Sequence, residues 1–178
     1  SKMYKPYDKS NFDIVTVCRL SVYHKGLDRL MRVAYRLNQE GLDYQWYIVG
    51  EGEGRAYLEQ TIAENNLTNI HLTGNKDNPY PYMKDADLFV LLSNYEGRPV
   101  VVDESLILNT PVLVTEYEAA HEQVDDTCGF VMPMDDKLIT DKLKELISHS
   151  ESLNDKKSYL IDCDRSKYET IDGMLEEI

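Results

Sequence analysis

The sequence predicts an α/β fold in which a Rossmann-like parallel sheet is sandwiched by helices. Strand-like apolar runs alternate with helical segments along residues 12–150. Most connections between them are short, about two to six residues, as in α/β units. The chain has 178 residues and is 42% hydrophobic, which is enough for one domain with a sizeable core. Together these features are typical of a doubly wound sheet with helices on both faces.

The first half of the chain is expected to hold three strands and two helices. Residues 13–18 read as the first strand, and a helix at 25–40 follows. Its apolar residues recur at helical spacing: Leu27, Leu30, Met31, Ala34 and Leu37. Gly41 suits the left-handed position just after the helix. Arg29, Arg32 and Arg36 are expected on the other side as a basic stripe, either solvated or used for docking. Strand 44–49, helix 53–66 and strand 69–73 come next.

The second half continues the alternation. A polar segment at 75–81 leads to a short helical turn and a strand at 87–92. A helix then runs to about Leu108, followed by strand 111–115, a short last strand within 127–132 and a helix at 135–149. Residues 1–11 are expected to be a linker or N-terminal extension. Residues 151–178 are polar with sparse apolar positions, which predicts one or two peripheral helices of the same domain.

The charge of the chain excludes several classes of partner. The net charge is −13, and an acidic body opposes non-specific binding to nucleic acid or anionic lipid. The three cysteines, Cys18, Cys128 and Cys163, are odd in number and widely spaced, which argues against a disulfide framework or a zinc site. No transmembrane run and no secretory signal is apparent. A cytoplasmic protein without nucleic-acid partners is expected.

Two motifs are better explained as structure than as ligand sites. The glycines of the segment 50–54 have the wrong spacing for a dinucleotide fingerprint and follow the second strand. A tight, flexible turn is expected there instead. Asp85 and Asp87 form a D-x-D string, but it precedes its strand and so lies away from the cleft expected at the other edge. The histidines show no catalytic spacing, so a hydrolase or kinase gains no support.

The most informative stretch carries two carboxylates, Glu96 and Glu104, eight positions apart. Glu96 is expected on the loop at the carboxyl end of a strand, and Glu104 inside the following helix. Pro99 fits the first helical position, where its missing N–H costs nothing. The free amides of residues 97–101 then face the cleft and suit a phosphate. Carboxylates accept hydrogen bonds from sugar and ribose hydroxyls, although surface ion pairing is the alternative.

A second candidate element follows the first strand. Arg19 comes directly after the strand, and Lys25 with Gly26 opens the next helix. A strand-to-helix loop with a cation at each end suits a diphosphate, and helix N-terminal amides add partial positive charge. The alternative is an ordinary surface Arg and Lys.

These elements occur in the order of one protein family. The series is Arg19-Leu20-Ser21, Lys25-Gly26, Val49-Gly50-Glu51-Gly52, Leu72-Thr73-Gly74, Ala86-Asp87, Ser93-Asn94-Tyr95-Glu96-Gly97, Glu104 and Thr110-Pro111-Val112. Over residues 12–149 the chain resembles the C-terminal domain of the group 1, or family 4, retaining glycosyltransferases, which is half of a GT-B fold.

The resemblance implies a role for each candidate residue. Arg19 and Lys25 would hold the donor diphosphate, Glu96 would contact the sugar hydroxyls and Glu104 the ribose. The loop residues Gly97, Arg98, Pro99 and Val100 would support the phosphates or sugar. The loops after Val49 and Thr73, with Tyr80 or Tyr82, would frame the base. Glu96, Arg19 and Lys25 would act in catalysis, in which the cations stabilise the departing diphosphate. No metal or other cofactor is expected.

The resemblance also implies the partners. The donor would be a nucleotide-sugar, by family frequency a UDP-sugar, and a hexosyltransferase would pass the sugar to a carbohydrate or lipid-linked acceptor. The acceptor site would belong to an N-terminal Rossmann-like domain, which could also hold the enzyme at the inner face of the membrane. The 178-residue chain would then be a C-terminal half, inactive alone.

Some positions depart from the commonest family pattern. Arg98 and Pro99 replace the frequent Phe-Gly, and the loop 116–122 lacks the usual glycines. The Glu-Gly-Arg-Pro version looks most like transferases of bacterial surface-polysaccharide synthesis. Two alternatives remain: a catalytically silent nucleotide-sugar-binding or docking module, and half of a GT-B-type sugar-nucleotide epimerase, a group that lacks this series.

Overall fold

The computed structural model describes residues 6–8 and 10–163 and has a single six-stranded sheet within them. The strands are β1 (Asp13–Val17), β2 (Gln45–Val49), β3 (Ile70–Gly74), β4 (Leu88–Leu91), β5 (Val112–Thr115) and β6 (Gly129–Met132). The helices are α1 (Leu27–Gln39), α2 (Arg55–Glu64), α3 (Tyr80–Asp85), α4 (Val100–Ile107), α5 (Ala120–Gln123), α6 (Asp136–Ser148) and α7 (Glu151–Asp162). The predicted α/β alternation is confirmed.

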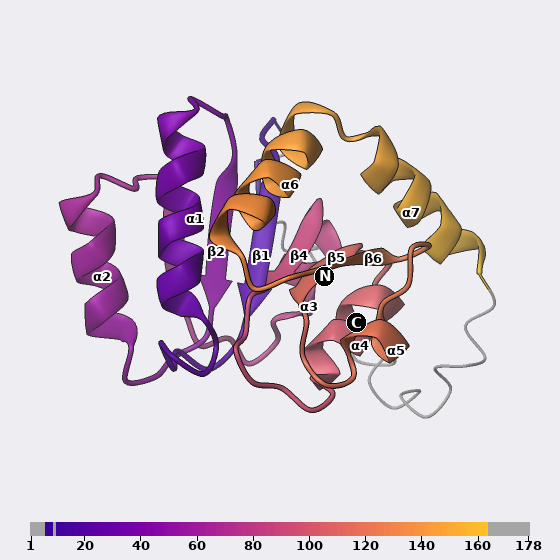
Figure 1. Cartoon of the computed structure of the whole chain (residues 1–178), viewed down its shortest axis with the longest axis horizontal. Helices are drawn as coiled ribbons and strands as arrows, with labels where there is room; N and C mark the ends of the chain where they lie inside the picture. Colours follow the sequence, from indigo (N-terminus) through magenta and orange to yellow (C-terminus); the bar gives the residue numbers. More distant parts are fainter. Residues whose placement is uncertain (1–5, 9, 164–178) are drawn as a thin grey trace.

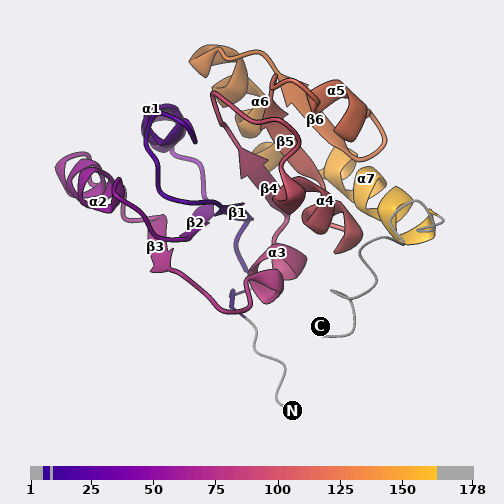
Figure 2. The same ribbon diagram turned by 90° about the horizontal axis from the view of Figure 1, so that it is seen from below.

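All neighbouring strands pair in parallel, in the order β3-β2-β1-β4-β5-β6 (Figure 1; β3 is labelled in Figure 2). The chain therefore builds outwards from β1 to β3, returns to the other side of β1 with β4, and builds outwards again. The strand order reverses between β1 and β4, where Ile14 and Val15 pair with Leu88 and Phe89. This reversal is a topological switch point, and its crevice lies at the carboxyl ends of the two strands.

Each face of the sheet has its own apolar cluster. The first joins the sheet to α1, α2 and α6 through residues such as Leu30, Leu58 and Leu143. The second joins it to α3, α4 and α5 through residues such as Met83 and Leu106. Figure 2 shows α1 and α2 on the opposite side of the sheet from α3 and α4. Burial on both faces explains why β4 and β5 are apolar throughout.

The segments outside the alternating pattern also contact the core. Helix α7 contributes Leu153 to the first cluster and Leu160 to the second. Before β1, the Tyr7 ring lies 4.5 Å from the Tyr47 ring, centroid to centroid, and the Tyr7 hydroxyl donates to the carbonyl of Tyr82 at 2.7 Å. The part of the predicted C-terminal helices beyond residue 163 lies outside the described residues.

The structure corrects several details of the sequence analysis. Pro99 is the residue before α4, with a ψ of 121°, so the helix begins one residue later than predicted. A short helix, α5, occupies part of the loop 116–122. The prediction of a solvated or docking basic stripe on α1 is wrong for Arg29. This residue is buried because α6 packs over that side of the helix.

The glycines of the loop after β2 are packed against the loop after β1. A Cβ on Gly50 would lie 1.9 Å from the carbonyl oxygen of Cys18, and one on Gly52 would lie 2.8 Å from the backbone of Leu20. Backbone hydrogen bonds join the same segments: the Leu20 amide donates to the carbonyl of Glu51 at 2.9 Å, and the Gly54 amide to that of Leu20 at 2.7 Å. A close backbone crossing therefore takes the place of the flexible turn expected from the sequence.

Among the described helices, none is both long and apolar enough to span a bilayer.

Candidate functional site

Two cavities flank the switch point at the carboxyl edge of the sheet. One, of about 440 Å³, lies over β1, β2 and β3, and Arg19, Glu51 and Lys76 are among its lining residues. The other, of about 580 Å³, lies over β1, β4 and β5, and Lys25 and Glu96 are among its lining residues. The loops that the sequence analysis assigned to a donor therefore surround one crevice, where open α/β sheets bind ligands.

The structure brings Lys25 and Glu96 into direct contact, although they are 71 positions apart. The ammonium of Lys25 donates to Oε1 of Glu96, and the hydroxyl of Ser93 donates to the same oxygen at 2.9 Å. The two charged side chains are 23% and 12% exposed. Neither hydrogen bond uses Oε2 of Glu96, so this oxygen is available to a ligand as far as the described residues are concerned.

The loop that carries Glu96 is anchored by hydrogen bonds before any ligand arrives. The hydroxyl of Thr115 donates to the carbonyl of Ser93 at 2.6 Å. The backbone amide of Asn94 donates to the carbonyl of His24 at 3.0 Å, and the Asn94 side chain donates to that of Tyr23 at 2.6 Å. The loops after β1 and β4 thus hold each other, which preorganises the carboxylate at the cavity.

Arg19 lies on the other cavity and is much more accessible. Its side chain is 75% exposed, and its guanidinium lies 3.3 Å from a carboxylate oxygen of Glu53. An exposed pair of this kind contributes little to stability and exchanges its partner easily. The guanidinium is therefore free to turn towards an anion in the crevice.

The loop before α4 leaves room beside the Lys25–Glu96 pair. A Cβ on Gly97 would meet no atom within 4 Å, so nothing in the described structure requires glycine there on steric grounds. Val100, the first residue of α4, is 56% exposed. Arg98 turns towards the first turn of α4, where its guanidinium lies 3.1 Å from Asp103. An open loop and free helix amides fit the predicted approach of a phosphate or sugar.

Glu104 is half-buried on α4 and has an aromatic partner. The Tyr80 hydroxyl donates to Oε1 of Glu104 at 3.4 Å. Burial raises the pKa of Glu104, and the hydrogen bond from Tyr80 opposes that rise. Tyr82, the other candidate for framing the base, is buried at 6% exposure in the second apolar cluster. The structure therefore places Tyr80, rather than Tyr82, beside a predicted donor residue.

Sequence reasoning missed several residues that line the site. Ser93 was part of the recognised series but had no role, and its signal was its position three residues before Glu96 at a strand end. Lys76 lines the first cavity, and a lone cation after a strand end could have suggested this. Glu116 and Glu118 line the second cavity from the loop after β5. Their place there depends on the strand order, which the sequence did not reveal.

Cys18 lines the first cavity, whereas Asp87 lies at the opposite end of the sheet. Burial raises the pKa of the Cys18 thiol to about 12, which favours the neutral thiol at neutral pH. The carboxylate of Asp87 accepts from the backbone amide of Asp13 at 2.8 Å, at the amino end of the sheet. Within residues 6–8 and 10–163, no group of three or more His, Cys, Asp or Glu side chains is arranged to hold a metal ion.

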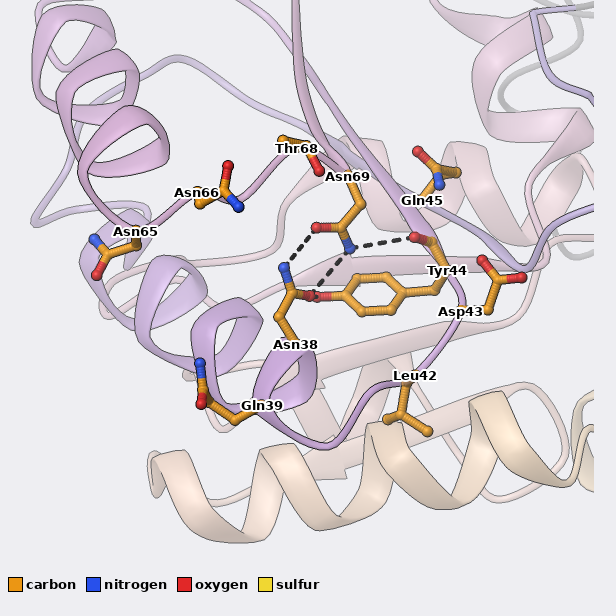
Figure 3. A pocket seen from close by; sticks show the side chains of 10 residues that line it. All are labelled: Asn38, Gln39, Leu42, Asp43, Tyr44, Gln45, Asn65, Asn66, Thr68 and Asn69. Carbon is orange, nitrogen blue, oxygen red and sulfur yellow. Dashed lines mark hydrogen bonds between the residues drawn. The ribbon is translucent and has the colours of Figure 1, made fainter.

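A further cavity, of about 480 Å³, lies at the amino ends of β2 and β3 and contains none of the predicted site residues. Its inner side chains are tied together (Figure 3). Asn38 donates to Asn69 at 2.7 Å, and the Tyr44 hydroxyl donates to Asn38 at 2.8 Å. The Asn69 side chain also donates to the carbonyl of Tyr44 at 3.2 Å. These bonds join the end of α1 to β2 and β3, so the network supports the fold.

Comparison with known proteins identifies the family. A family model described as "Glycosyl transferases group 1" matches residues 11–149. The chain belongs to the group 1 glycosyltransferases. It is 32% identical over 124 residues to an uncharacterised glycosyltransferase of Methanocaldococcus jannaschii, MJ1059, which covers 69% of this chain and 30% of the relative. It is 29% identical over 133 residues to the amylovoran biosynthesis glycosyltransferase AmsK of Erwinia amylovora, covering 69% and 32%. The chain thus matches about a third of the length of these relatives.

Solved structures show the same fold. A mutant of S. aureus TarM in complex with fondaparinux, alpha-GlcNAc-glycerol and UDP superposes with a TM-score of 0.78 at 21% identity, covering 90% of this chain and 34% of that one. The C-terminal domain of LpcC, a group 1 glycosyl transferase family protein from Francisella tularensis, superposes with a TM-score of 0.72 at 24% identity, covering 87% and 85%. At these identities the likeness establishes the Rossmann-like fold that this chain shares with glycosyltransferases of the GT-B type, and nothing finer.

The raised pKa of Glu104 predicts a pH-dependent effect of Glu104→Gln on stability. Because the folded-state pKa lies above the unfolded one, the ionised carboxylate destabilises the fold once the pH rises through the folded pKa, and not below the unfolded pKa. Glu104→Gln should therefore raise the free energy of unfolding at about pH 7, and this gain should vanish near about pH 3. Urea unfolding at the two pH values measures both quantities.

Glu122→Gln is the control for this experiment, because it removes a carboxylate from α5 that is exposed to solvent rather than buried. It should give no gain at neutral pH. A Glu104→Gln variant that is no more stable than the natural chain at about pH 7 would contradict the prediction.

Proposed function

We propose that this domain binds the nucleotide-sugar donor of a retaining hexosyltransferase, with UDP as the nucleotide. The observation that carries the proposal is the Lys25–Glu96 contact at the switch point, with Arg19 on the adjoining cavity. A cation and a carboxylate with a free oxygen are the groups that a diphosphate and a sugar ring each need. The bound UDP of a structural neighbour supports the choice of nucleotide.

The two cavities divide the donor between them in this proposal. The nucleoside occupies the cavity over β1, β2 and β3, near Lys76, and its ribose reaches Glu104. The diphosphate lies between Arg19 and Lys25, close to the free amides at the start of α4. The sugar occupies the second cavity, where Oε2 of Glu96 accepts from its hydroxyl groups.

This arrangement places positive charge where charge develops in the reaction. When the bond between sugar and diphosphate breaks, the sugar becomes oxocarbenium-like and the leaving group gains negative charge. Arg19 and Lys25 stabilise that leaving group, and Glu96 holds the sugar in register. Lys25 and Glu96 are already fixed by the two loops, so little reorganisation is needed at the moment of reaction.

The charges around the second cavity favour an uncharged sugar. The cavity is lined by three glutamates, Glu96, Glu116 and Glu118, and by Lys25. Glu116 and Glu118 are exposed and stand where the family's usual glycines are missing. A uronate or another anionic sugar would meet like charge there, whereas a neutral hexose would not.

The remaining steps of the reaction are proposed for a longer protein. We place the acceptor site, for a carbohydrate or lipid-linked acceptor, in an N-terminal Rossmann-like domain. The biosynthetic role of the relative AmsK supports a place in bacterial surface-polysaccharide synthesis. No metal is proposed for the donor site, because two cations and helix amides already face the diphosphate.

The donor site is tested by nucleotide binding to the 178-residue chain. UDP and UDP-glucose should bind, and Arg19→Ala and Lys25→Ala should each weaken binding at least about tenfold, since each removes a charge-assisted contact. Isothermal titration measures the dissociation constants. Arg36→Ala is the control, because it removes an exposed arginine of α1 that lines neither cavity. Absence of binding to the natural chain would contradict the proposed function.

The uncharged-sugar preference is tested with UDP-glucose against UDP-glucuronic acid. Two exposed carboxylates close to a uronate cost on the order of 1 kcal/mol together in water, or about fivefold in affinity. The double variant Glu116→Gln, Glu118→Gln should lose most of this preference, and high salt should narrow it. Glu122→Gln, an exposed glutamate of α5 outside the cavity, should leave the preference intact. Equal binding of both donors to the natural chain would rule the preference out.

The chain alone is expected to bind donor without transferring sugar, because the acceptor site is assigned to a second domain. An assay with labelled UDP-glucose and a panel of mono- and oligosaccharide acceptors should yield product only at the level of the buffer blank. Transfer clearly above that level would show that the described domain holds a complete active site.

A further inference from the structure

We infer that Arg29 is a positioning residue for the donor site: it fixes the loop that carries Glu96 against the loop that carries Lys25. The inference rests on the proposed function for its effect on donor binding. The expected effect on the structure of the loop is independent of the proposed function, because it is measured without ligand.

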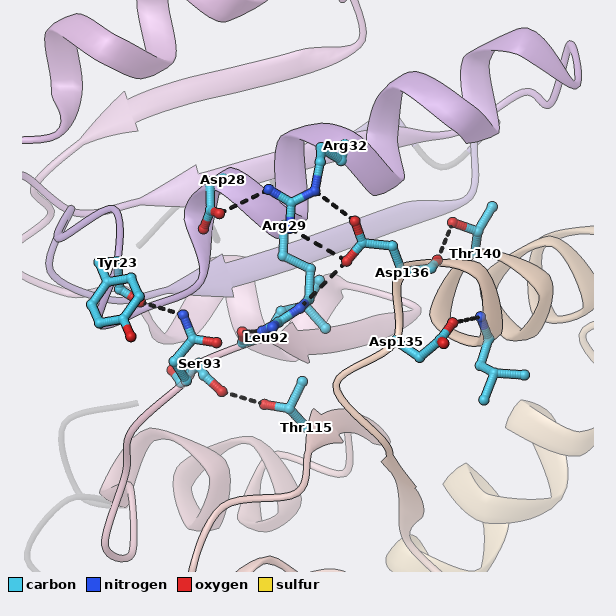
Figure 4. A network of polar contacts seen from close by, with 12 residues as sticks. Tyr23, Asp28, Arg29, Arg32, Leu92, Ser93, Thr115, Asp135, Asp136 and Thr140 are labelled. Carbon is cyan, nitrogen blue, oxygen red and sulfur yellow. Dashed lines mark hydrogen bonds and ion pairs between the residues drawn. The ribbon is translucent and has the colours of Figure 1, made fainter.

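Arg29 reaches from α1 into the end of the sheet. The residue is 9% exposed, and its Nη1 donates to the carbonyl oxygen of Leu92 at 3.0 Å (Figure 4). Leu92 directly follows β4 and is itself 1% exposed. The guanidinium therefore holds the backbone four residues before Glu96, at the point where the strand gives way to the functional loop.

The same carbonyl is where the two loops touch. A Cβ on Gly26 would lie 2.0 Å from the Leu92 oxygen and 3.2 Å from Nη1 of Arg29, so the bare Gly26 backbone packs directly against both groups. Gly26 has a φ of 59° and follows Lys25 in the chain. Displacement of the Leu92 carbonyl would thus move Glu96 on one side and the Lys25–Gly26 turn on the other.

The charge of Arg29 is balanced from the opposite direction. Its Nε lies 3.5 Å from Oδ1 of Asp136, in the first turn of α6. A buried guanidinium needs such a partner, because an unpaired buried charge is strongly destabilising. The guanidinium of Arg29 is therefore held from two sides, by Asp136 of α6 and by the Leu92 carbonyl after β4, while its backbone belongs to α1.

Arg32 provides a natural comparison within the same network. It pairs with Asp136 at 2.5 Å and with Asp28 at 2.8 Å, but its contacts stay between α1 and α6 (Figure 4). If the network served only to join these helices, losing Arg29 and losing Arg32 would have the same consequence for the donor site. If Arg29 positions the loop, only its loss reaches Glu96.

The first test compares Arg29→Met and Arg32→Met in the ligand-free chain by amide hydrogen exchange. The probe is the Asn94 amide, which bonds across the two loops to the carbonyl of His24. Its exchange should accelerate at least about tenfold in Arg29→Met and stay near the natural rate in Arg32→Met, under conditions where both are folded. Equal exchange of Asn94 in the two variants would overturn the inference.

The second test uses donor binding and distinguishes positioning from a general loss of structure. Arg29→Met should weaken UDP-glucose at least about fivefold more than it weakens UDP, because Glu96 meets only the sugar. Arg32→Met should leave the ratio of the two affinities unchanged. Arg29→Lys, which keeps a buried cation and one donor group and so is the safer variant to fold, should restore part of the ratio and part of the Asn94 protection.

The outcomes separate the two proposals. If the natural chain binds neither UDP nor UDP-glucose, the proposed function fails, and the exchange of Asn94 alone decides the role of Arg29. If both ligands bind and Arg29→Met weakens them by the same factor, Arg29 has only a structural role and the inference is overturned.

Discussion

The structure depends on the reversal of strand order between β1 and β4. β1 and β4 are adjacent and end at the same edge of the sheet, but the chain crosses to one face after β1 and to the other face after β4. The loops that follow the two strands must share the space above them. They do so through one buried carbonyl, that of Leu92, against which Gly26 packs and to which Arg29 donates. A glycine is required where the loops touch, because any side chain would collide with the carbonyl oxygen. The Lys25–Glu96 contact lies beside this crossing, because Lys25 directly precedes Gly26 and Glu96 follows Leu92 by four residues.

Much of the fold could be predicted from the sequence because its signals are local. Apolar runs of four to six residues and helical spacing of leucines located the strands and the long helices, and the position of Glu96 after a strand placed it at the carboxyl edge. The contacts that assemble the site could not be predicted, because they join distant parts of the chain. The inward direction of Arg29 depends on Asp136, more than a hundred residues later. The rigid crossing at Gly50 and Gly52 likewise depends on the backbone of Cys18 and Leu20.

An acidic chain can bind an anionic donor only through local charge, and here Arg19, Lys25 and Arg98 each have a carboxylate partner. Arg19 pairs with Glu53 largely in solvent, where the net attraction is weak and a diphosphate can replace the partner. Arg98 is half-exposed and pairs with Asp103, whose side chain is 14% exposed. The Lys25–Glu96 pair is different, because it is mostly buried and the Ser93 hydroxyl also supports the carboxylate. Separating those two charges inside the site would leave each one poorly solvated.

A donor is therefore expected to bind to the pair rather than to break it. Lysine has three N–H groups, and one of them meets Oε1 of Glu96, which leaves the others to face a phosphate oxygen. Glutamate keeps Oε2 for a sugar hydroxyl. The two ends of the pair then contact the two sides of the bond that breaks, with the cation on the leaving diphosphate and the carboxylate on the sugar. In this arrangement an ion pair that contributes little net stability is retained because it fixes the distance between the two groups, and that distance is what a transition state with separating charges requires.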